Sequence, residues 1–312
     1  MKKVSIVVPC CNEAAAVPLL YAALQPIMTA QSEYQWEVLF INDGSKDETL
    51  AVIKALRLAD ARVNYVDLSR NFGKERAMLA GFDYVTGDCM VLMDADLQHP
   101  PQVIPEMLSW WEQGYDDVYG KRISRGREHW LRKRLSLAFY KILQKSARME
   151  ILQNVGDFRL LDRCCINTLK KLREQERYTK GMFSWIGFRK HEVLFETRDR
   201  AAGRSSWSVR QLFRLAVEGI TSFTVVPLKI SAVIGFIVSF FAFVYMIITL
   251  LKTLIYGEPV HGYPTIMVTI LFLGGVQLIS IGIIGEYLGR IFHETKNRPT
   301  YIAREYNGER VF

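Results

Sequence analysis

Two long segments without a charged residue constrain the fold of this chain more than any other feature. The first runs from Ile230 to Leu251 and the second from Thr265 to Gly285. Each is long enough to cross ~30 Å of hydrocarbon as a helix. Two buried helices of a soluble core are the alternative, but few polar residues interrupt either segment. The connection KTLIYGEPVHGYP contains Gly and Pro, so we predict a two-helix transmembrane hairpin over residues 230–288.

Basic residues flank the two segments on one side. The connection between the two segments has only Lys252. The basic residues before the first segment are Arg210, Arg214 and Lys229, and those after the second segment are Arg290, Lys296, Arg298 and Arg304. Because positively charged flanks stay in the cytoplasm, we predict a multi-pass protein of the inner (cytoplasmic) membrane with both termini cytoplasmic. The apolar stretch after the first residues is too short for a signal peptide, and the five cysteines are expected to be reduced.

The balance of charge indicates an anionic partner. The chain of 312 residues carries a net charge of +8. Nucleic acid, phosphorylated ligands and an anionic membrane surface all fit such a charge. The basic residues flank the membrane segments and no aromatic-rich platform for RNA is evident, so nucleic acid is the poorest of the three.

The first 120 residues alternate between short apolar runs and helical patterns. VSIVV, WEVLFI, VNYVDL and CMVLM are typical of strands that are buried on both faces, and residues 14–31, 47–60 and 74–86 are typical of helices. This alternation predicts a parallel, Rossmann-like α/β sheet. We assign residues 1–204 to this cytoplasmic catalytic domain.

Polar side chains follow the predicted strands where each of them ends. Asn12 and Glu13 follow the first strand, Asp43 follows the second, and Asp94 and Asp96 follow the strand VLM. Ligands of such sheets bind outside the carboxyl ends of the strands, so we expect these side chains to line one crevice.

Asp94 and Asp96 lie one residue apart and would repel each other without a positive partner. A divalent cation, Mg²⁺ or Mn²⁺, would relieve that repulsion, with Gln98 as a neutral oxygen ligand and substrate phosphates completing the set. The alternative is a solvated acidic turn before the next helix. The position at the end of a buried strand favours the metal.

Two further segments are predicted to be amphipathic helices in the membrane interface. Residues 127–150 place Leu, Phe and Ile on one helical face among many Arg and Lys, and residues 205–229 lead into the first span. A packed surface helix is the alternative for the first. We assign residues 289–312 to a cytoplasmic C-terminal tail.

Several motifs resemble one known family. VVPCCNE, INDGSKDET and MDADLQHPP resemble the strand ends of glycosyltransferase family 2, which has the GT-A fold. RNFGKERAMLAGFDYVTGD, NVGDFRLLDR, EGITSF and GEYLGRIFHETKNRP are similar to the polyprenyl-phosphate glycosyltransferases within it, and nearest to the bactoprenol glucosyltransferases. The similarity covers nearly the whole chain, including the hairpin.

The resemblance implies roles for particular residues. The nucleotide would be held by Pro9, Asn12, Glu13, Asp43 and Asp94, the metal by Asp94, Asp96 and Gln98, and the acceptor phosphate by Arg122, Arg134, Arg200, Arg204 and Ser205. Asp96, Asp157 and Arg122 are the implied catalytic residues. The loop RAAGRSSW departs from the family pattern, because Ser206 stands where a lysine is expected. Surface charge is the alternative for Arg122, Arg134 and Arg204.

Asp157 in GDFRL has two interpretations. It is either a structural partner of Arg159 or an active-site carboxylate. A phosphate acceptor, already largely ionised, mainly requires placement rather than a strong base.

The activity implied by the resemblance is inverting transfer of a hexose from a nucleotide sugar to a polyprenyl phosphate lipid at the membrane. UDP-glucose and undecaprenyl phosphate are the expected substrates, and the product would serve O-antigen or cell-envelope glycan modification. One alternative is transfer of another sugar in the same reaction class. The other is a non-catalytic membrane scaffold or flippase partner that retains the fold. Glycines in the second span are suited to helix association, either in a homo-oligomer or within the hairpin.

Overall fold

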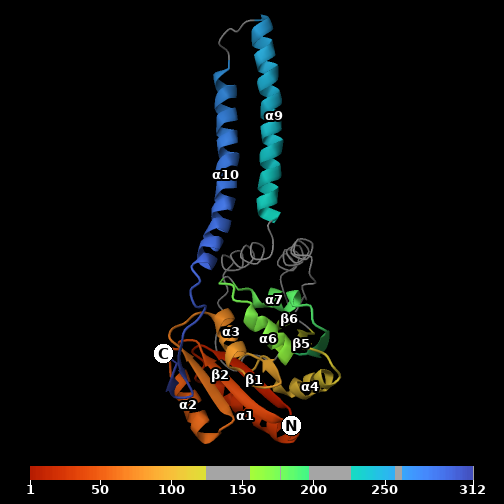
Figure 1. Ribbon diagram of the computed structural model, residues 1–312, viewed down its shortest axis with the longest axis vertical. Helices are drawn as coiled ribbons and strands as arrows, with labels where there is room; N and C mark the ends of the chain where they lie inside the picture. The colour runs from red at the N-terminus through yellow and green to blue at the C-terminus, as the bar shows by residue number, and fades with distance from the viewer. Residues whose placement is uncertain (124–154, 176, 197–225, 257–261, 312) are drawn as a thin grey trace. The chain divides into compact units, whose positions relative to one another are not determined.

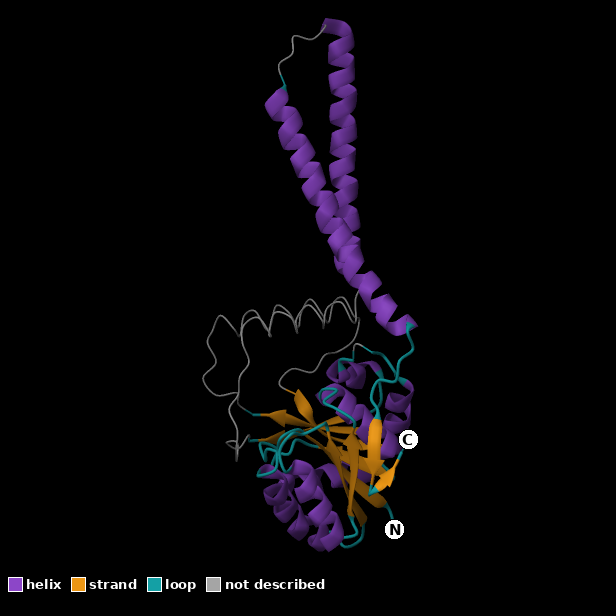
Figure 2. Cartoon of the chain, turned by 90° about the vertical axis from the view of Figure 1, so that its left-hand side faces the viewer, coloured by secondary structure: helices purple, strands orange, loops and turns teal. Residues whose placement is uncertain are grey.

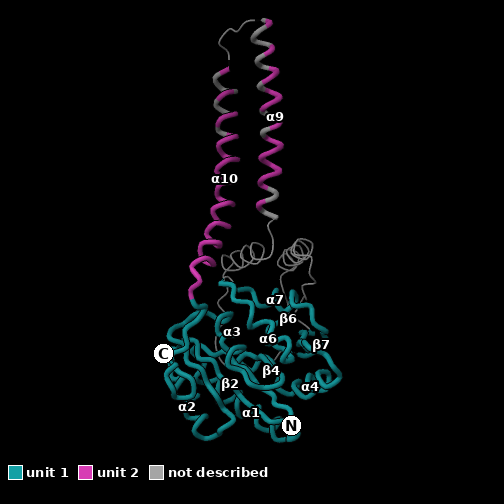
Figure 3. Tube along the Cα trace, in the orientation of Figure 1, with its two compact units in different colours: residues 1–213, 299–312 teal, residues 214–298 magenta. Residues whose placement is uncertain are grey.

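The computed structural model describes residues 1–123, 155–175, 177–196, 226–256 and 262–311, and its chain forms two compact units. One unit comprises residues 1–213 and 299–312, and the other comprises residues 214–298 (Figure 3). Residues 299–312 are thus grouped with the first unit, and the predicted division into domains stays a prediction. The predicted helix over 127–150 and residues 205–225 lie outside the described residues.

The first unit alternates strands and helices, as Figure 1 shows. Its strands are β1 (Lys3–Cys10), β2 (Gln35–Asn42), β3 (Val63–Leu68), β4 (Cys89–Leu92), β5 (Asp117–Arg122), β6 (Val155–Asp162), β7 (Lys190–Phe195), β8 (Ala303–Tyr306) and β9 (Glu309–Arg310). Its helices are α1 (Ala16–Ala30), α2 (Thr49–Ala59), α3 (Lys74–Tyr84), α4 (Ile104–Glu112), α6 (Arg163–Lys171) and α7 (Thr179–Trp185), with a 3₁₀ turn, η1, at Pro101–Val103. The four predicted strands and three predicted helices are confirmed.

All these strands form one sheet with the order β7-β5-β6-β4-β1-β2-β3-β8-β9. The strands β4, β1, β2 and β3 are parallel, as predicted, and helices lie on both sides of the sheet (Figure 2). The sheet as a whole is mixed, because β6 pairs antiparallel with β4 and with β5. β8, from the C-terminal residues, pairs antiparallel with β3.

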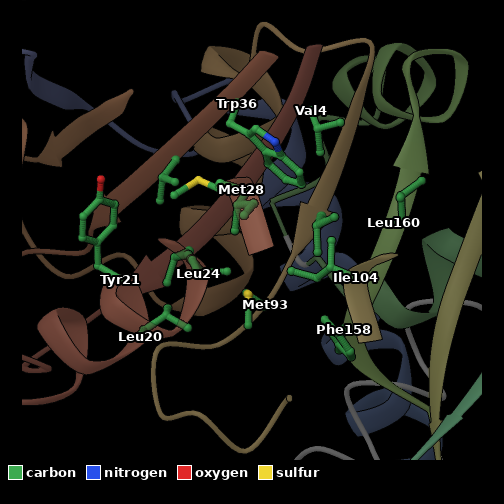
Figure 4. Close-up of a cluster of buried hydrophobic side chains, with 14 of the residues drawn as sticks. Val4, Leu20, Tyr21, Leu24, Met28, Trp36, Met93, Ile104, Phe158 and Leu160 are labelled. Carbon is green, nitrogen blue, oxygen red and sulfur yellow. The ribbon is translucent and has the colours of Figure 1, made fainter. Parts of the chain in front are cut away.

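The core forms on both faces of β1, because successive side chains of a strand point to opposite faces. Val4, Ile6 and Val8 join a buried cluster with residues of α1 and α4, part of which Figure 4 shows. Val7 faces α3 on the other side. A methyl group on Gly81 of α3 would come within 2.5 Å of Val7 Cγ1, so only glycine allows α3 to pack this closely on β1.

The described residues of the second unit form two long helices, α9 (Val226–Tyr256) and α10 (Tyr263–Thr295), which contact each other over part of their length (Figures 1 and 2). With 31 and 33 residues at 1.5 Å of rise, each is about 45–50 Å long. Within the described residues, one segment, Phe272–Thr295, is long and apolar enough to cross a membrane. The two long helices lie where the hairpin is predicted, whereas the two-helix transmembrane hairpin stays a prediction.

Candidate active site

The carboxyl ends of three parallel strands bring the predicted polar residues to one edge of the sheet. Register pairs Cys10 of β1 with Asn42 of β2, and Val7 of β1 with Leu92 of β4. The residues that follow these strands therefore emerge side by side. Pro9 lies within β1 itself, opposite Ile41.

The loop after β1 is held by hydrogen bonds to the loop after β2. The backbone N–H of Asn12 donates to Ser45 Oγ at 3.0 Å, and its side-chain oxygen accepts from Lys46 N at 2.8 Å. The N–H of Glu13 donates to Thr49 Oγ1 at 2.8 Å. Asn12 has a φ of 58°, a left-handed conformation that asparagine tolerates better than most residues. These contacts fix the shape of the predicted nucleotide loop.

Asp43, directly after β2, organises the loop that leads into α3. Its two carboxylate oxygens accept from Phe72 N at 2.7 Å and from Gly73 N at 2.9 Å. Burial raises the pKa of Asp43, and these two hydrogen bonds offset part of that rise. A methyl group on Gly44 would come within 2.3 Å of the backbone at Arg70, so the two loops touch directly. Asp43 thereby positions the first residue of α3, Lys74.

Lys74 lies between two carboxylates from different strands. Its ammonium nitrogen is 2.6 Å from Asp94 Oδ1 and 2.7 Å from Asp157 Oδ2. Burial lowers the pKa of Lys74, but attraction to Asp94 and Asp157 outweighs this effect and raises the pKa above its ordinary value. Lys74 is not among the site residues predicted from the sequence. The signal was its place in RNFGKER, directly after the glycine that begins a helix.

Asp157 is buried on β6 and pairs with Lys74 instead of Arg159. Burial acts to raise the pKa of Asp157, but the positive charges of Lys74 and Lys180 lower it to about 2. Arg159 instead forms a buried pair with Asp117 at 3.0 Å and lies 3.6 Å from the ring centre of Phe183. Among the described residues, Asp157 is therefore not the ion-pair partner of Arg159, and Asp157 lies with Asp94 at the same edge of the sheet, joined to it through Lys74.

The turn after Asp94 presents the other predicted metal ligands. Asp96 Oδ1 accepts from Gln98 N at 3.1 Å, and Leu97 between them has a φ of 59°. Carboxylate and amide oxygens are the ligands that Mg²⁺ and Mn²⁺ prefer, so the donor set fits such an ion. Lys74 contacts one carboxylate oxygen of Asp94. A metal ion at this turn would therefore need further oxygen ligands, which substrate phosphates supply in many Mg²⁺ sites.

A second acidic cluster lies elsewhere and has a structural role. Ligand atoms of Asp116, Asp162 and Cys164 lie within 4.8 Å of one another. The Asp162 carboxylate accepts from Trp111 Nε1 at 2.7 Å and from Cys164 N at 2.8 Å, while Asp116 accepts from Arg189 N at 3.1 Å. These hydrogen bonds link α4, the end of β6 and the start of β7, so the carboxylates of Asp116 and Asp162 already have protein partners.

Arg122 and His99 lie close to Gly156, the residue before Asp157 in β6. Arg122 is the last residue of β5, and His99 follows Gln98 in the turn after β4. A methyl group on Gly156 would lie 3.7 Å from His99 Nε2 and 3.9 Å from Arg122 Nη2. Arg122 thus lies near Gly156, which precedes the predicted catalytic residue Asp157. Arg134, Arg200, Arg204, Ser205 and Ser206 lie outside the described residues.

Two family models match this chain. Residues 5–169 match the glycosyl transferase family 2, and residues 226–291 match the GtrB C-terminal hairpin. The bactoprenol glucosyl transferase of the SfII prophage in Shigella flexneri is 43% identical over 303 residues, covering 97% of this chain and 98% of that protein. The prophage homolog in Escherichia coli (strain K12) is 43% identical over 302 residues, with the same coverage.

The solved structures that resemble the chain are more distant. Glucosyl-3-phosphoglycerate synthase of Mycobacterium tuberculosis, in complex with Mn²⁺ and UDP-glucose, is 17% identical. It has a TM-score of 0.47 and covers 69% of this chain and 76% of its own. The family match and the sequence relatives confirm the resemblance, and the chain belongs to glycosyltransferase family 2 as one of its transferase enzymes.

Proposed function

We propose that the enzyme transfers glucose from UDP-glucose to undecaprenyl phosphate at the cytoplasmic membrane face. The observation that carries the proposal is the identity of 43% to bactoprenol glucosyl transferases along 97% of the chain, hairpin included. The charged cluster of Asp94, Asp157 and Lys74 at the carboxyl edge of the sheet is the expected place for a charged sugar donor.

Asp94, Asp96 and Gln98 would hold Mg²⁺ or Mn²⁺ together with the diphosphate of the donor. The ion supplies positive charge that stabilises the departing diphosphate. Lys74 adds a fixed positive charge on the Asp94 side of the same crevice. Asn12, Glu13 and Asp43 would bind the nucleotide through the loops that their hydrogen bonds hold in place.

The acceptor is a phosphate monoester, whose second pKa of about 6 leaves it largely ionised at neutral pH. An acceptor oxygen would attack the anomeric carbon on the face opposite the diphosphate. The new bond joins that carbon to the lipid phosphate oxygen, and the bond to UDP breaks with its electron pair leaving on UDP. The configuration inverts, so an α-linked donor gives a β-linked lipid phosphosugar.

Asp157 then has a positioning role rather than that of a strong base. With a pKa of about 2 it stays ionised at neutral pH and accepts a proton poorly. Its carboxylate holds Lys74, while Arg122 would orient the acceptor phosphate. The residues Arg134, Arg200, Arg204 and Ser205 are proposed to assist Arg122 in binding that phosphate.

The helices α9 and α10 are proposed to cross the membrane and to keep both termini cytoplasmic. Basic residues on that side would attract an anionic leaflet, which holds the lipid acceptor. The acceptor lipid then diffuses to the enzyme within the membrane.

The test is transfer of radiolabel from a panel of UDP- and GDP-sugars to undecaprenyl phosphate by the purified full chain with Mg²⁺ or Mn²⁺. We expect organic-extractable label from UDP-glucose, and none from the matched variant Asp96→Asn. Label from a different sugar would correct the donor and keep the reaction class. No transfer from any donor by folded protein would overturn the proposal.

A further inference from the structure

His99 is buried close to the backbone of Asp94, and its ring is fixed by its neighbours. Only 1% of the residue is exposed. The ring stacks on Phe158 with 5.0 Å between ring centres and an interplanar angle of 7°, and it meets Phe195 edge-on at 5.9 Å. The directions of its two nitrogens are therefore set by packing on β6 and β7.

One nitrogen of His99 has a partner and the other has none among the described residues. The backbone N–H of Asp94 donates to Nδ1 over a long 3.4 Å, so Nδ1 is the acceptor of the ring and the hydrogen lies on Nε2. Nε2 is buried and makes no hydrogen bond in that part of the chain. Buried donors are nearly always paired, with protein, water or ligand, so this one points to a missing acceptor.

Arg122 supplies a second donor group close to the same place. Within the described residues, Arg122 Nε is also buried without a hydrogen bond. Its Nη2 and His99 Nε2 both lie within 4 Å of the point where Gly156 would carry a side chain. Among the described residues, and apart from the chain neighbours of Gly156, the atoms nearest to this point are His99 Nε2, Arg122 Nη2 and Phe158 N, none of which is an acceptor. A cationic guanidinium and a neutral N–H therefore converge on it.

We propose that His99 Nε2–H and Arg122 form a subsite over Gly156 that binds one phosphate oxygen of a substrate. The identity of that phosphate rests on the proposed function, because it belongs either to the diphosphate of the donor or to the monoester of the acceptor. Asp94 and Asp96 are acidic groups near His99, and Lys74 offsets part of their charge. His99 is thus a binding residue in addition to its contact with Asp94.

Two variants of His99 separate its nitrogens. His99→Asn keeps an acceptor near the position of Nδ1 and removes the distal donor, whereas His99→Gln keeps a distal N–H and removes the acceptor for Asp94. Binding is measured by calorimetry on the full chain in nanodiscs, with UDP plus Mn²⁺ and with farnesyl phosphate. Uridine and farnesol are the phosphate-free controls.

We expect His99→Asn to weaken binding of at least one phosphate probe by about 10-fold to 100-fold, as for a lost hydrogen bond to a charged group. His99→Gln should retain most of the affinity, and the controls should not change. Weakening confined to farnesyl phosphate assigns the subsite to the acceptor, and weakening confined to UDP assigns it to the donor. Unchanged affinity in His99→Asn, or a larger loss in His99→Gln, would overturn the proposal.

Gly156→Ala tests the same space without altering His99. Its methyl group would make ordinary contacts of 3.7 Å and 3.9 Å with the protein, so folding should be preserved while the phosphate oxygen is excluded. We expect weaker binding of the same phosphate probe, and unchanged binding would contradict the subsite even if His99→Asn does not fold. Wild-type protein that binds the probes but transfers no label would contradict the proposed function alone.

Discussion

Lys74 Nζ lies 2.7 Å from Asp157 Oδ2, so the first residue of α3 is paired with a carboxylate of β6. The same nitrogen is 2.6 Å from Asp94, directly after β4. A lysine therefore supplies part of the positive charge that the sequence pattern assigned to a metal ion alone. The pair also joins the acidic turn to the strand that carries Asp157.

Replacing Lys74 by methionine should slow transfer and tighten metal binding. Without the ammonium group, Asp94 and Asp157 keep uncompensated charge, and an electrostatic contact in the crevice is lost. We expect kcat to fall by about 10-fold to 100-fold, whereas Mn²⁺ should bind the free protein more tightly because a competing cation is gone. Transfer assays and calorimetry with Mn²⁺ measure the two effects.

The matched control for this prediction is Lys121→Met. Lys121 is a lysine of β5 that pairs with the exposed Glu192 at 2.8 Å. Its removal should leave both measurements unchanged. Equal effects of the two variants would mean that Lys74 acts only through the net charge of the domain.

The strand ends could be predicted from sequence because each buried strand is an apolar run followed by polar residues. Asp43 and Asp94 were placed at one edge by the rule that parallel strands end together, and the structure agrees. Their partners could not be predicted in this way. Asp43 holds the backbone of Phe72 and Gly73, a contact that depends on how two loops pack.

The outer parts of the sheet were not predictable from local pattern. β6 contains Arg159, and a buried arginine makes sense only with Asp117 of the neighbouring strand. β8 follows the long helix α10 in sequence and pairs with β3, so its place depends on contacts between distant segments. Lys74 was overlooked for the same reason, since both of its partners lie on other elements.

Asp157 should make the free energy of unfolding depend on pH in the acid range. Its pKa is lowered from an ordinary 3.8 to about 2, so its contribution is complete above the unfolded value and is lost as the pH falls through the folded value. We expect the difference in unfolding free energy between wild type and Asp157→Asn to be constant from pH 5 to pH 8. It should shrink by about 2 kcal/mol between about pH 4 and pH 2.

Thermal unfolding of the two proteins in detergent across that pH range provides the measurement. The difference between the variants cancels the titration of other carboxylates. A difference that grows on acidification would show that Asp157 is protonated more readily in the folded protein, which contradicts its pairing with Lys74.

Asp96→Asn should abolish transfer without unfolding the protein. Asp96 contacts its own turn through Gln98 N at 3.1 Å, a bond that the amide oxygen of asparagine can still accept. Loss of one ligand charge should lower kcat by about 100-fold or more, and EDTA should stop the wild-type reaction until Mg²⁺ or Mn²⁺ is restored. Label transfer and the unfolding temperature are the two measurements. Activity that resists EDTA would exclude the metal from the proposed mechanism.

Arg304 should anchor the C-terminal residues to the catalytic unit. Its Nε lies 2.8 Å from Asp67 Oδ2, and the fully buried Asp67 also accepts from Asn42 Nδ2 at 2.7 Å. Arg304→Leu leaves this carboxylate with one partner, and because the arginine is half exposed we expect a loss of about 1–3 kcal/mol rather than the full cost of a buried charge. Arg310→Leu, on exposed β9, is the control and should be neutral. If the loss of stability comes from the unpaired carboxylate of Asp67, adding Asp67→Asn to Arg304→Leu should recover part of the unfolding temperature. A further decrease in the double variant would mean that Arg304 stabilises the fold through other contacts.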